Sequence, residues 1–324
     1  MPVEQRTVAA EDADQRLDRW FKRHFPTLGH GRLEKLLRTG QVRVDGKRVK
    51  ASDRLETGQV IRIPPIDLTP APKPQAKPID EREAKDLRAR VLHKDADVLI
   101  IDKPAGLAVQ GGTGTDKHLD GLLDALRFDA KERPRLVHRL DRDTSGVLVL
   151  ARSAEAARWL GEAFQARDAD KTYWAVVAGV PKPRQGRIDL KLAKLPGKAG
   201  ERVVVDPKEG KRAVTDFAVV EEVRNLIAWV ALKPITGRTH QLRAHLEAIG
   251  HPILGDGKYG GKAAHLDIAD APKQLQLHAR SIALRRPNGK MLKVEAPLPA
   301  HMKATWVTFG FSARPDHDPF RDAP

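Results

Sequence analysis

The stretch "HRLDRDTSGVLVLAR", residues 138–152, joins a charged loop directly to a continuous apolar run. Its first half places Asp141 and Asp143 among arginines, and its second half, residues 147–150, contains only Val and Leu. Such a run predicts a buried strand. The strand would draw the charged loop toward the interior or the floor of a cleft, where a buried carboxylate needs partners.

The same loop allows two other interpretations. Its arginines and aspartates could form a surface ion-pair lattice, which is the ordinary role of such charges. Ser145 could act as a nucleophile with His138 and Asp141, but the loop lacks the glycine two residues before the serine that a nucleophile elbow requires. Hydrogen bonds from Thr144 and Ser145 to local backbone fit the turn better. His138 is then expected to be an orienting or core histidine.

The composition favours a protein that binds polyanions. The chain has 324 residues and a formal net charge of +15, from 58 Lys and Arg against 43 Asp and Glu. That length allows two domains, and the charge favours nucleic acid ahead of an anionic membrane. Neither a leader sequence nor an apolar span of transmembrane length is evident, so we expect a cytoplasmic protein. The absence of cysteine excludes disulfides, thiolate nucleophiles and cysteine-based zinc sites.

Residues 11–63 are predicted to form a small module of two helices and a hairpin. Apolar residues recur at helical spacing in 17–21 and again in 33–37. After them, Asp45-Gly46 suits a two-residue turn between alternating polar and apolar residues. This order, with a basic second helix, resembles the alpha-L RNA-binding motif of small ribosomal-subunit proteins and of many RNA-modifying enzymes.

Basic residues cluster on this module. Residues 29–50 hold seven basic side chains against two acidic ones, and those of the second helix recur every three residues, so they share one face. Most charge runs are only a solvated helix side, but clustering over a helix and the adjoining hairpin predicts a surface that tracks RNA phosphates. The residues assigned to RNA binding are Arg32, Lys35, Arg38, Arg43, Lys47, Arg48 and, from the second domain, Lys103.

Residues 64–88 are predicted to be a linker. Six prolines occur within 64–78, without a periodic apolar pattern, as is typical of an extended tether. Beyond the linker, apolar runs alternate with helical patterns over 89–311, which predicts one larger domain. Residues 312–324 are expected to be a loose tail.

Two further patterns lack the residues that a ligand site requires. The glycines of "VQGGTGTDKH", residues 109–118, are not followed by Gly-Lys-Ser/Thr and lack the dinucleotide spacing. His240 and His245 are five residues apart with no acidic residue between them, which does not match metal-ligand spacing. We therefore expect a flexible loop, no nucleotide cofactor and no metal.

Several motifs follow one another along the second domain. "DKPAGLAVQGGTG" (102–114) precedes the opening stretch, and "KTYWAVVAG" (171–179), "PITGRTHQLRAHL" (234–246) and "HPILGDGKYG" (251–260) follow it. Their order and approximate spacing resemble those of the RluA/RluC family of RNA pseudouridine synthases. The His-Arg-Leu-Asp sequence of 138–141 is highly specific for that family, and the Gly-Gly of the first motif is most similar to the RluC branch.

The resemblance implies an α+β fold: a mixed, mainly antiparallel sheet flanked by helices, in addition to the small N-terminal α/β RNA-binding module. It also implies isomerisation of a uridine in RNA to its carbon-glycosidic isomer. The base leaves the ribose, rotates and is rejoined through a carbon. Every atom of the reactant is in the product, so no cofactor, group donor or metal is expected.

The resemblance also implies roles for four residues. Asp141 would be the nucleophile, and Arg243 would pair with its carboxylate. A forked guanidinium would keep that carboxylate charged once a flipped base excludes water. Tyr173 would lie against the base and assist proton removal from the ring carbon, and Arg139 would enter the RNA stack in place of the flipped uridine. Extrusion of the uridine from the RNA stack costs a few kcal/mol, and stacking of about 1–3 kcal/mol per base can offset this cost.

Other functions stay open at this point. The RluC-like opening favours large-subunit ribosomal RNA as substrate, with transfer RNA as the alternative. A non-catalytic RNA-binding or ribosome-assembly factor would use the basic module alone. A hydrolase that uses Asp141 as a general acid is disfavoured, because the neighbouring arginines favour the ionised carboxylate. Whether Asp141 attacks the sugar or the uracil is not decided by the sequence, and we expect a monomer.

Overall fold

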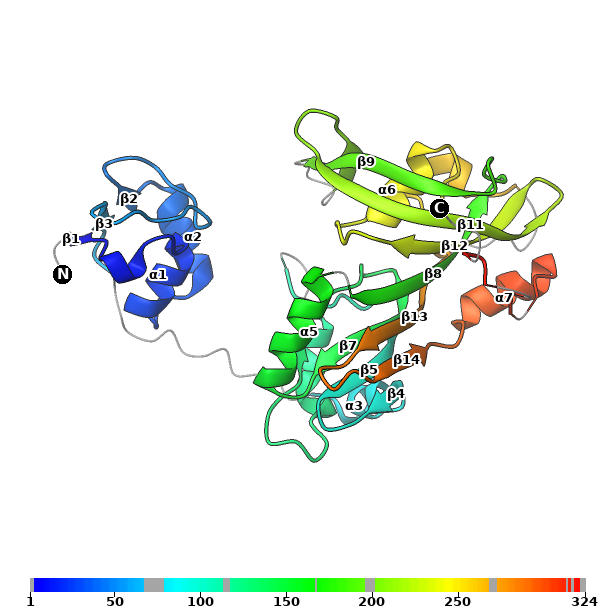
Figure 1. Cartoon of the computed structure of the whole chain (residues 1–324), viewed down its shortest axis with the longest axis horizontal. Helices are drawn as coiled ribbons and strands as arrows, with labels where there is room; N and C mark the ends of the chain where they lie inside the picture. Colours follow the sequence, from blue (N-terminus) through cyan, green and yellow to red (C-terminus); the bar gives the residue numbers. More distant parts are fainter. Residues whose placement is uncertain are drawn as a thin grey trace. The chain divides into compact units, whose positions relative to one another are not determined.

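The computed structural model describes residues 3–66, 79–112, 117–166, 168–195, 202–267, 273–312, 314–315 and 318–320. The chain divides into two compact units, Met1–Lys77 and Pro78–Pro324 (Figure 1). Most of the proline-rich part of the expected linker, residues 67–78, lies outside the described residues.

The first unit combines a three-stranded antiparallel sheet, in the order β1-β3-β2, with two helices. The unit begins before residue 11, because β1 pairs with β3. Asp45 and Gly46 have φ values of 48° and 75°, as a two-residue hairpin turn requires, and one apolar core joins the helices to the sheet. Its elements are β1 (Glu4–Thr7), a 3-10 turn η1 (Ala10–Asp12), α1 (Leu17–His24), α2 (His30–Arg38), β2 (Arg43–Val44) and β3 (Val60–Ile63).

The second unit is built on an eleven-stranded sheet with the order β10-β9-β11-β12-β8-β13-β7-β5-β4, to which β14 adds beside β13 and β6 beside β7. Among the described strands, β13 and β7 form the one parallel pair, so the sheet is mixed and mainly antiparallel, as predicted. The strands are β4 (Val91–Lys94), β5 (Val98–Lys103), β6 (Arg135–Leu136), β7 (Ser145–Ala151), β8 (Ala169–Ala178), β9 (Gln185–Leu195), β10 (Arg202–Val205), β11 (Lys211–Val223), β12 (Ile227–Pro234), β13 (Leu277–Arg285) and β14 (Met291–Glu295).

The apolar run of the opening stretch forms β7, in which every residue is buried. β7 lies between β5 and β13, and its alternate residues enter two different apolar cores, as expected for a strand covered on both faces. The helices and 3-10 turns of this unit are α3 (Glu81–Arg88), α4 (Leu119–Leu122), η2 (Leu123–Leu126), α5 (Ala154–Ala166), α6 (Gln241–Ala248), η3 (Gly261–Ala264) and α7 (Ala300–Phe309).

Two segments differ from the expected linker and tail. Residues 81–88 form α3, because Asp80 caps the helix and Leu87 packs into an apolar core of the second unit. The linker therefore does not extend to residue 88. In the tail, the ring of Phe320 packs beneath the ammonium group of Lys233, which lies 4.7 Å from the ring centroid. That part of the tail is attached to the sheet.

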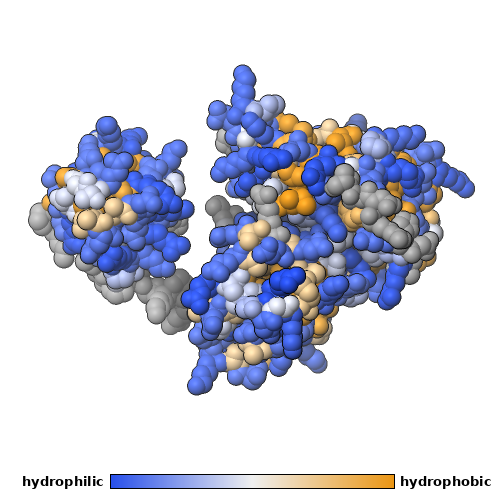
Figure 2. All heavy atoms as spheres, in the orientation of Figure 1, coloured by the Kyte–Doolittle hydropathy of each residue, from blue (hydrophilic) through white to orange (hydrophobic). Residues whose placement is uncertain are grey.

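The expected flexible loop at 109–118 is structured where it is described, since Ala108 and His118 form a bridge and His118 caps α4. Residues 113–116 lie outside the described part. In the part of the chain that is described, every helix is too short or too polar to cross a membrane. Figure 2 shows a mainly hydrophilic surface on this face of each unit, with some hydrophobic areas on both.

Candidate active site

Asp141 lies four residues before β7, in the loop that enters the strand. Gly146 permits this entry. Its φ is 109°, and a Cβ there would meet the carbonyl oxygen of Ala279 at 2.2 Å, so only glycine lets β7 approach β13 so closely. The backbone N–H of Thr144 donates to the carbonyl of Asp141 at 3.2 Å and closes the turn. The charged loop is thus fixed where the parallel pairing begins.

A cavity of about 470 Å³ opens at this loop, a volume within the range of small-ligand sites. Asp141, Arg139, Tyr173 and Arg243 all line it, so the structure brings the four expected catalytic residues to one place. They come from the loop before β7, from β8 and from α6. Arg139 is exposed at this cavity and makes no ion pair within 4.0 Å to a described residue.

The carboxylate of Asp141 is enclosed, with 19% of the side chain exposed. Its one ion-pair contact within 4.0 Å among the described residues is to His240, whose Nε2 lies 3.9 Å from Oδ1. His240 precedes α6 and has φ 51° and ψ 21°, a left-handed conformation that is uncommon outside glycine. From the sequence, His240 was weighed only as a metal ligand, and its place beside Asp141 was missed.

The expected ion pair between Arg243 and Asp141 is not formed. Nε and Nη2 of Arg243 donate to the two carboxylate oxygens of Asp256, each at 2.7 Å, and the two side chains are 6% and 0% exposed. Burial opposes the charge of Arg243, but Asp256, with a smaller contribution from Asp141, holds the pKa of Arg243 above its ordinary value. The guanidinium fork is occupied by Asp256, so Asp141 experiences Arg243 only as a nearby charge.

Tyr173 lies in β8 and packs against two apolar cores. Burial, together with the charge of Asp141, raises the pKa of Tyr173. The phenol therefore stays protonated at neutral pH. Lys171, two residues earlier, lines the same cavity, and burial lowers its pKa. It lies in the "KTYW" motif, in which only the tyrosine was predicted to have a role.

Lys103 was assigned to RNA binding, and the structure contradicts this. Its side chain is fully buried. Nζ donates to the carbonyls of Pro104, Leu107 and Arg142 at 2.9, 2.9 and 3.0 Å, which uses all three of its donors. Burial lowers the pKa of Lys103 to about 8, against the opposing charges of Asp143, Asp141 and Asp102. Lys103 therefore ties the loop after β5 to the loop that carries Asp141.

His138 and Ser145 do not form a nucleophilic pair. Nε2 of His138 accepts the backbone N–H of Val149 at 2.8 Å, and burial lowers the pKa of His138 to about 3. The hydroxyl of Ser145 lies 2.8 Å from Nδ1 of His278, with both groups buried. Ser145 thus bonds a distant strand rather than local backbone. His138 bonds the backbone of β7, in line with the expectation of an orienting or core histidine.

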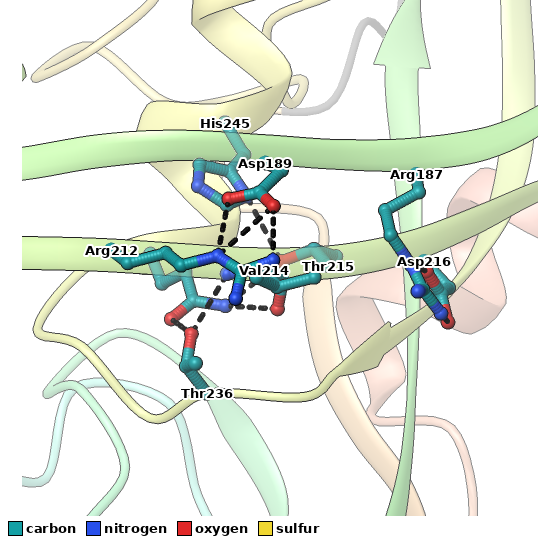
Figure 3. A network of polar contacts seen from close by, with 9 residues as sticks. Arg187, Asp189, Arg212, Val214, Thr215, Asp216, Thr236 and His245 are labelled. Carbon is teal, nitrogen blue, oxygen red and sulfur yellow. Dashed lines mark hydrogen bonds and ion pairs between the residues drawn. The ribbon is translucent and has the colours of Figure 1, made fainter. Parts of the chain in front are cut away.

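Gln241 holds the loop that carries His240. Its Nε2 donates to the carbonyl of Val214 and to Oγ1 of Thr215, both at 2.9 Å. Its Oε1 accepts from Oγ1 of Thr236 at 2.6 Å and from the backbone of Arg238 at 3.0 Å. All four hydrogen-bonding positions of the amide are filled, and Figure 3 labels three of the partner residues, Val214, Thr215 and Thr236. The start of α6 is therefore fixed to β11, and with it the backbone of His240.

The remaining RNA-binding candidates lie in the first unit. Arg43 is half-buried and donates to the carbonyls of Gly40 and Gly46 at 3.1 and 3.0 Å, so it braces the hairpin turn. The other five are exposed: Arg32, Lys35, Arg38, Lys47 and Arg48.

Comparison with known proteins identifies the family. Residues 97–248 match the family model described as RNA pseudouridylate synthase. The chain is 36% identical over 300 residues to the ribosomal large subunit pseudouridine synthase C of Salmonella typhi, covering 91% of this chain and 93% of that one. This chain belongs to the RluA/RluC family of RNA pseudouridine synthases. The enzyme of the same name from Haemophilus influenzae is also 36% identical, over 93% of this chain and 94% of its own.

Solved structures agree with this assignment. Human RNA pseudouridylate synthase domain containing 4 superposes with a TM-score of 0.59 at 29% identity, covering 71% of this chain and 96% of its own. Human RNA pseudouridylate synthase domain containing 1 gives 0.53 at 27% identity, covering 70% and 96%. The predicted α+β fold and the predicted family are both confirmed. As an RNA pseudouridine synthase, the chain is an isomerase.

Proposed function

We propose that this RNA pseudouridine synthase isomerises uridines of large-subunit ribosomal RNA, with Asp141 as the nucleophile. The observation that carries the proposal is the enclosed carboxylate of Asp141 in a cavity that also holds Tyr173 and Arg139. The substrate class rests on the names of the relatives, which are synthases of the ribosomal large subunit. Work on ribosomal RNA would place the enzyme in the cytoplasm, and we expect it to act as a monomer.

The reaction leaves the composition of the RNA unchanged. The bond between the ribose and the ring nitrogen breaks, the uracil rotates, and a bond forms between the ribose and ring carbon 5. Carbon 5 then loses its proton, and the freed ring nitrogen takes up a proton, so the atoms balance. An aspartate can carry the covalent intermediate. A protonated Tyr173 can lie against the base and donate a hydrogen bond. Because burial raises the pKa of Tyr173, it is a better support for the base than an acceptor of the carbon-bound proton.

Arg139 is suited to fill the gap that a flipped uridine leaves. Its side chain is exposed at the cavity and is not held by an ion pair in the described structure. A guanidinium plane can stack between bases, and stacking contributes about 1–3 kcal/mol per base. We therefore expect Arg139→Ala to weaken the binding of RNA that must be flipped more than the binding of RNA in which the target uridine is unpaired.

The test is isomerisation of large-subunit ribosomal RNA transcripts that carry tritium at carbon 5 of uridine. Each turnover releases that hydrogen to water. We expect release with the wild type and none with Asp141→Asn, with RNA binding retained by the variant. Asp143→Asn is the matched control, because Asp143 lies two residues away and 55% of its side chain is exposed. Equal tritium release by the wild type and Asp141→Asn would remove Asp141 from the mechanism.

The same assay separates the alternatives. Transfer RNA labelled in the same way should release little tritium, and preferential release from it would change the substrate class. A non-catalytic assembly factor predicts no tritium release from any RNA, and it predicts that Asp141→Asn complements a deletion strain fully. Mapping pseudouridines in the ribosomal RNA of that strain would identify the target positions.

A further inference from the structure

His240 occupies a position that its backbone does not favour. It has a left-handed conformation, which a residue with a Cβ adopts only when the surrounding structure imposes it. The backbone N–H of Ala244 donates to the carbonyl of His240 at 3.0 Å, which holds this conformation at the start of α6. Such strain concentrates where a side chain must point in one direction. Here the imidazole points toward Asp141 on one side and Tyr259 on the other.

The hydrogen bonds of Tyr259 and the charge of Asp141 favour one tautomer of His240. The backbone N–H of Val203 can only donate, and it lies 3.0 Å from the oxygen of Tyr259. The phenol accepts that bond, so its own hydrogen is available for Nδ1 of His240, 2.8 Å away. Nδ1 of a neutral imidazole that accepts carries no hydrogen, which leaves the hydrogen on Nε2. That N–H faces Oδ1 of Asp141.

The state of His240 agrees with this assignment. Burial lowers the pKa of His240, against the opposing charge of Asp141, while Arg243 and Lys258 lower it further and Asp256 raises it. The imidazole is thus neutral at neutral pH, as the hydrogen bond from Tyr259 requires.

Arg243 cannot take the place of His240. Its fork is filled by Asp256, and its guanidinium lies over the ring of Tyr259, 4.9 Å from the centroid. Asp256 also accepts the backbone N–H of Tyr259 at 3.1 Å. The Arg243–Asp256 pair therefore positions Tyr259, and Tyr259 in turn positions His240.

We propose that His240 is a positioning residue for Asp141: its Nε2–H fixes the carboxylate, and the hydroxyl of Tyr259 fixes the tautomer and direction of its ring. The proposal rests on the role of Asp141 given under Proposed function. The distance of 3.9 Å exceeds a hydrogen bond by roughly 1 Å, and bonds of this kind are often long without substrate and shorten in the complex. Substrate binding is expected to close the gap.

The experiment compares single-turnover rates of tritium release with RNA dissociation constants for four full-length variants. His240→Ala removes the donor, and we expect a rate about 10- to 100-fold lower, as for a misplaced catalytic group, at an unchanged dissociation constant. His240→Gln keeps an N–H donor on a long side chain and should recover part of the rate. Tyr259→Phe removes only the hydroxyl and keeps the ring beneath Arg243, and it should lower the rate by about 10-fold.

His93→Ala is the matched control. His93 is also a partly buried histidine beside a carboxylate, with its Nε2 2.7 Å from Oδ2 of Asp95, but it does not line the cavity. A purely structural role for His240 would shift the melting temperature and RNA affinity together with the rate, whereas a positioning role shifts the rate alone. If His240→Ala does not fold, Tyr259→Phe decides the question by itself.

A wild-type rate in His240→Ala or in Tyr259→Phe would overturn the inference. The result for Asp141→Asn separates this failure from failure of the proposed function. Loss of activity in Asp141→Asn with full activity in His240→Ala rejects the positioning role alone. Full activity in Asp141→Asn rejects both.

Discussion

The exposed basic face of the first unit and the buried charges of the second unit are stabilised in different ways. On the basic face of the first unit, Lys35, Arg38 and Lys47 are exposed to solvent. In the second, charged groups enter the interior, as Arg243 and Lys103 do. A surface charge acts through the summed field that it helps to create, whereas a buried charge depends on one fixed partner. Substitutions of the buried charges of the second unit should therefore have larger effects than substitutions on the basic face of the first unit.

Loss of the carboxylate partner of Arg243 is expected to have the largest effect. Asp256→Asn leaves a buried guanidinium without its counter-charge, which should lower the free energy of unfolding of the second unit by about 3–5 kcal/mol. Hydrogen exchange on the full chain, resolved by peptide, would measure the free energy of unfolding of each unit separately. Asp189→Asn, at the exposed partner of Arg212, is the control and should change nothing measurable. Equal losses in the free energy of unfolding for the two variants would contradict the expected difference between buried and exposed charges.

Acidification should destabilise the second unit through its buried histidines. Burial lowers the pKa of His278 to about 4 and that of His245 to about 4. As the pH falls below 6.5, the unfolded state binds protons that the folded state does not, so stability is lost between pH 6.5 and 4 at up to about 1.4 kcal/mol per pH unit for each histidine. His278→Gln, which cannot titrate, should make this dependence shallower. An unchanged slope would show that His278 is charged in the folded state.

Lys103→Met should have an intermediate effect. The substitution leaves three backbone carbonyls without their donor, so we expect a loss of about 1–3 kcal/mol in the second unit. RNA affinity and its salt dependence should not change in the fraction that is folded, because the ammonium group is buried. A weaker salt dependence in Lys103→Met would restore its original assignment as an RNA contact.

Substitutions on the basic helix should change stability least. Replacing Arg32, Lys35 and Arg38 by Gln is expected to shift the free energy of unfolding of the first unit by about 0.5 kcal/mol or less, since all three are exposed. The affinity for RNA should nevertheless fall, because phosphate contacts are lost. The slope of log affinity against log salt should flatten by roughly 2, at about 0.7 per phosphate contact to a single strand. An unchanged slope would show that this helix does not contact RNA.

Local patterns predicted the parts of the site that are continuous in the sequence. The apolar run after Ser145 predicted a buried strand, and Asp45-Gly46 predicted a two-residue hairpin turn. Partners distant in the sequence were harder to predict. The sequence predicted that Arg243 would pair with Asp141, whereas in the fold it pairs with Asp256. Gly255 lies next to Asp256 and permits this path of the chain. Its φ is positive, and a Cβ there would meet the carbonyl oxygen of Gln274 at 2.1 Å, so only glycine fits.

The sequence by itself determined the family, the buried strand behind Asp141 and the basic face of the first unit, since each depends on spacing within a short segment or on ordered motifs. Only the tertiary structure decided which charges are buried and which partner each one takes. In the folded chain Lys103 is buried, Arg243 pairs with Asp256, and His240 lies beside Asp141. The physical reason is that a buried charge is stabilised by groups within hydrogen-bond distance, and these come from segments that the folded chain brings together.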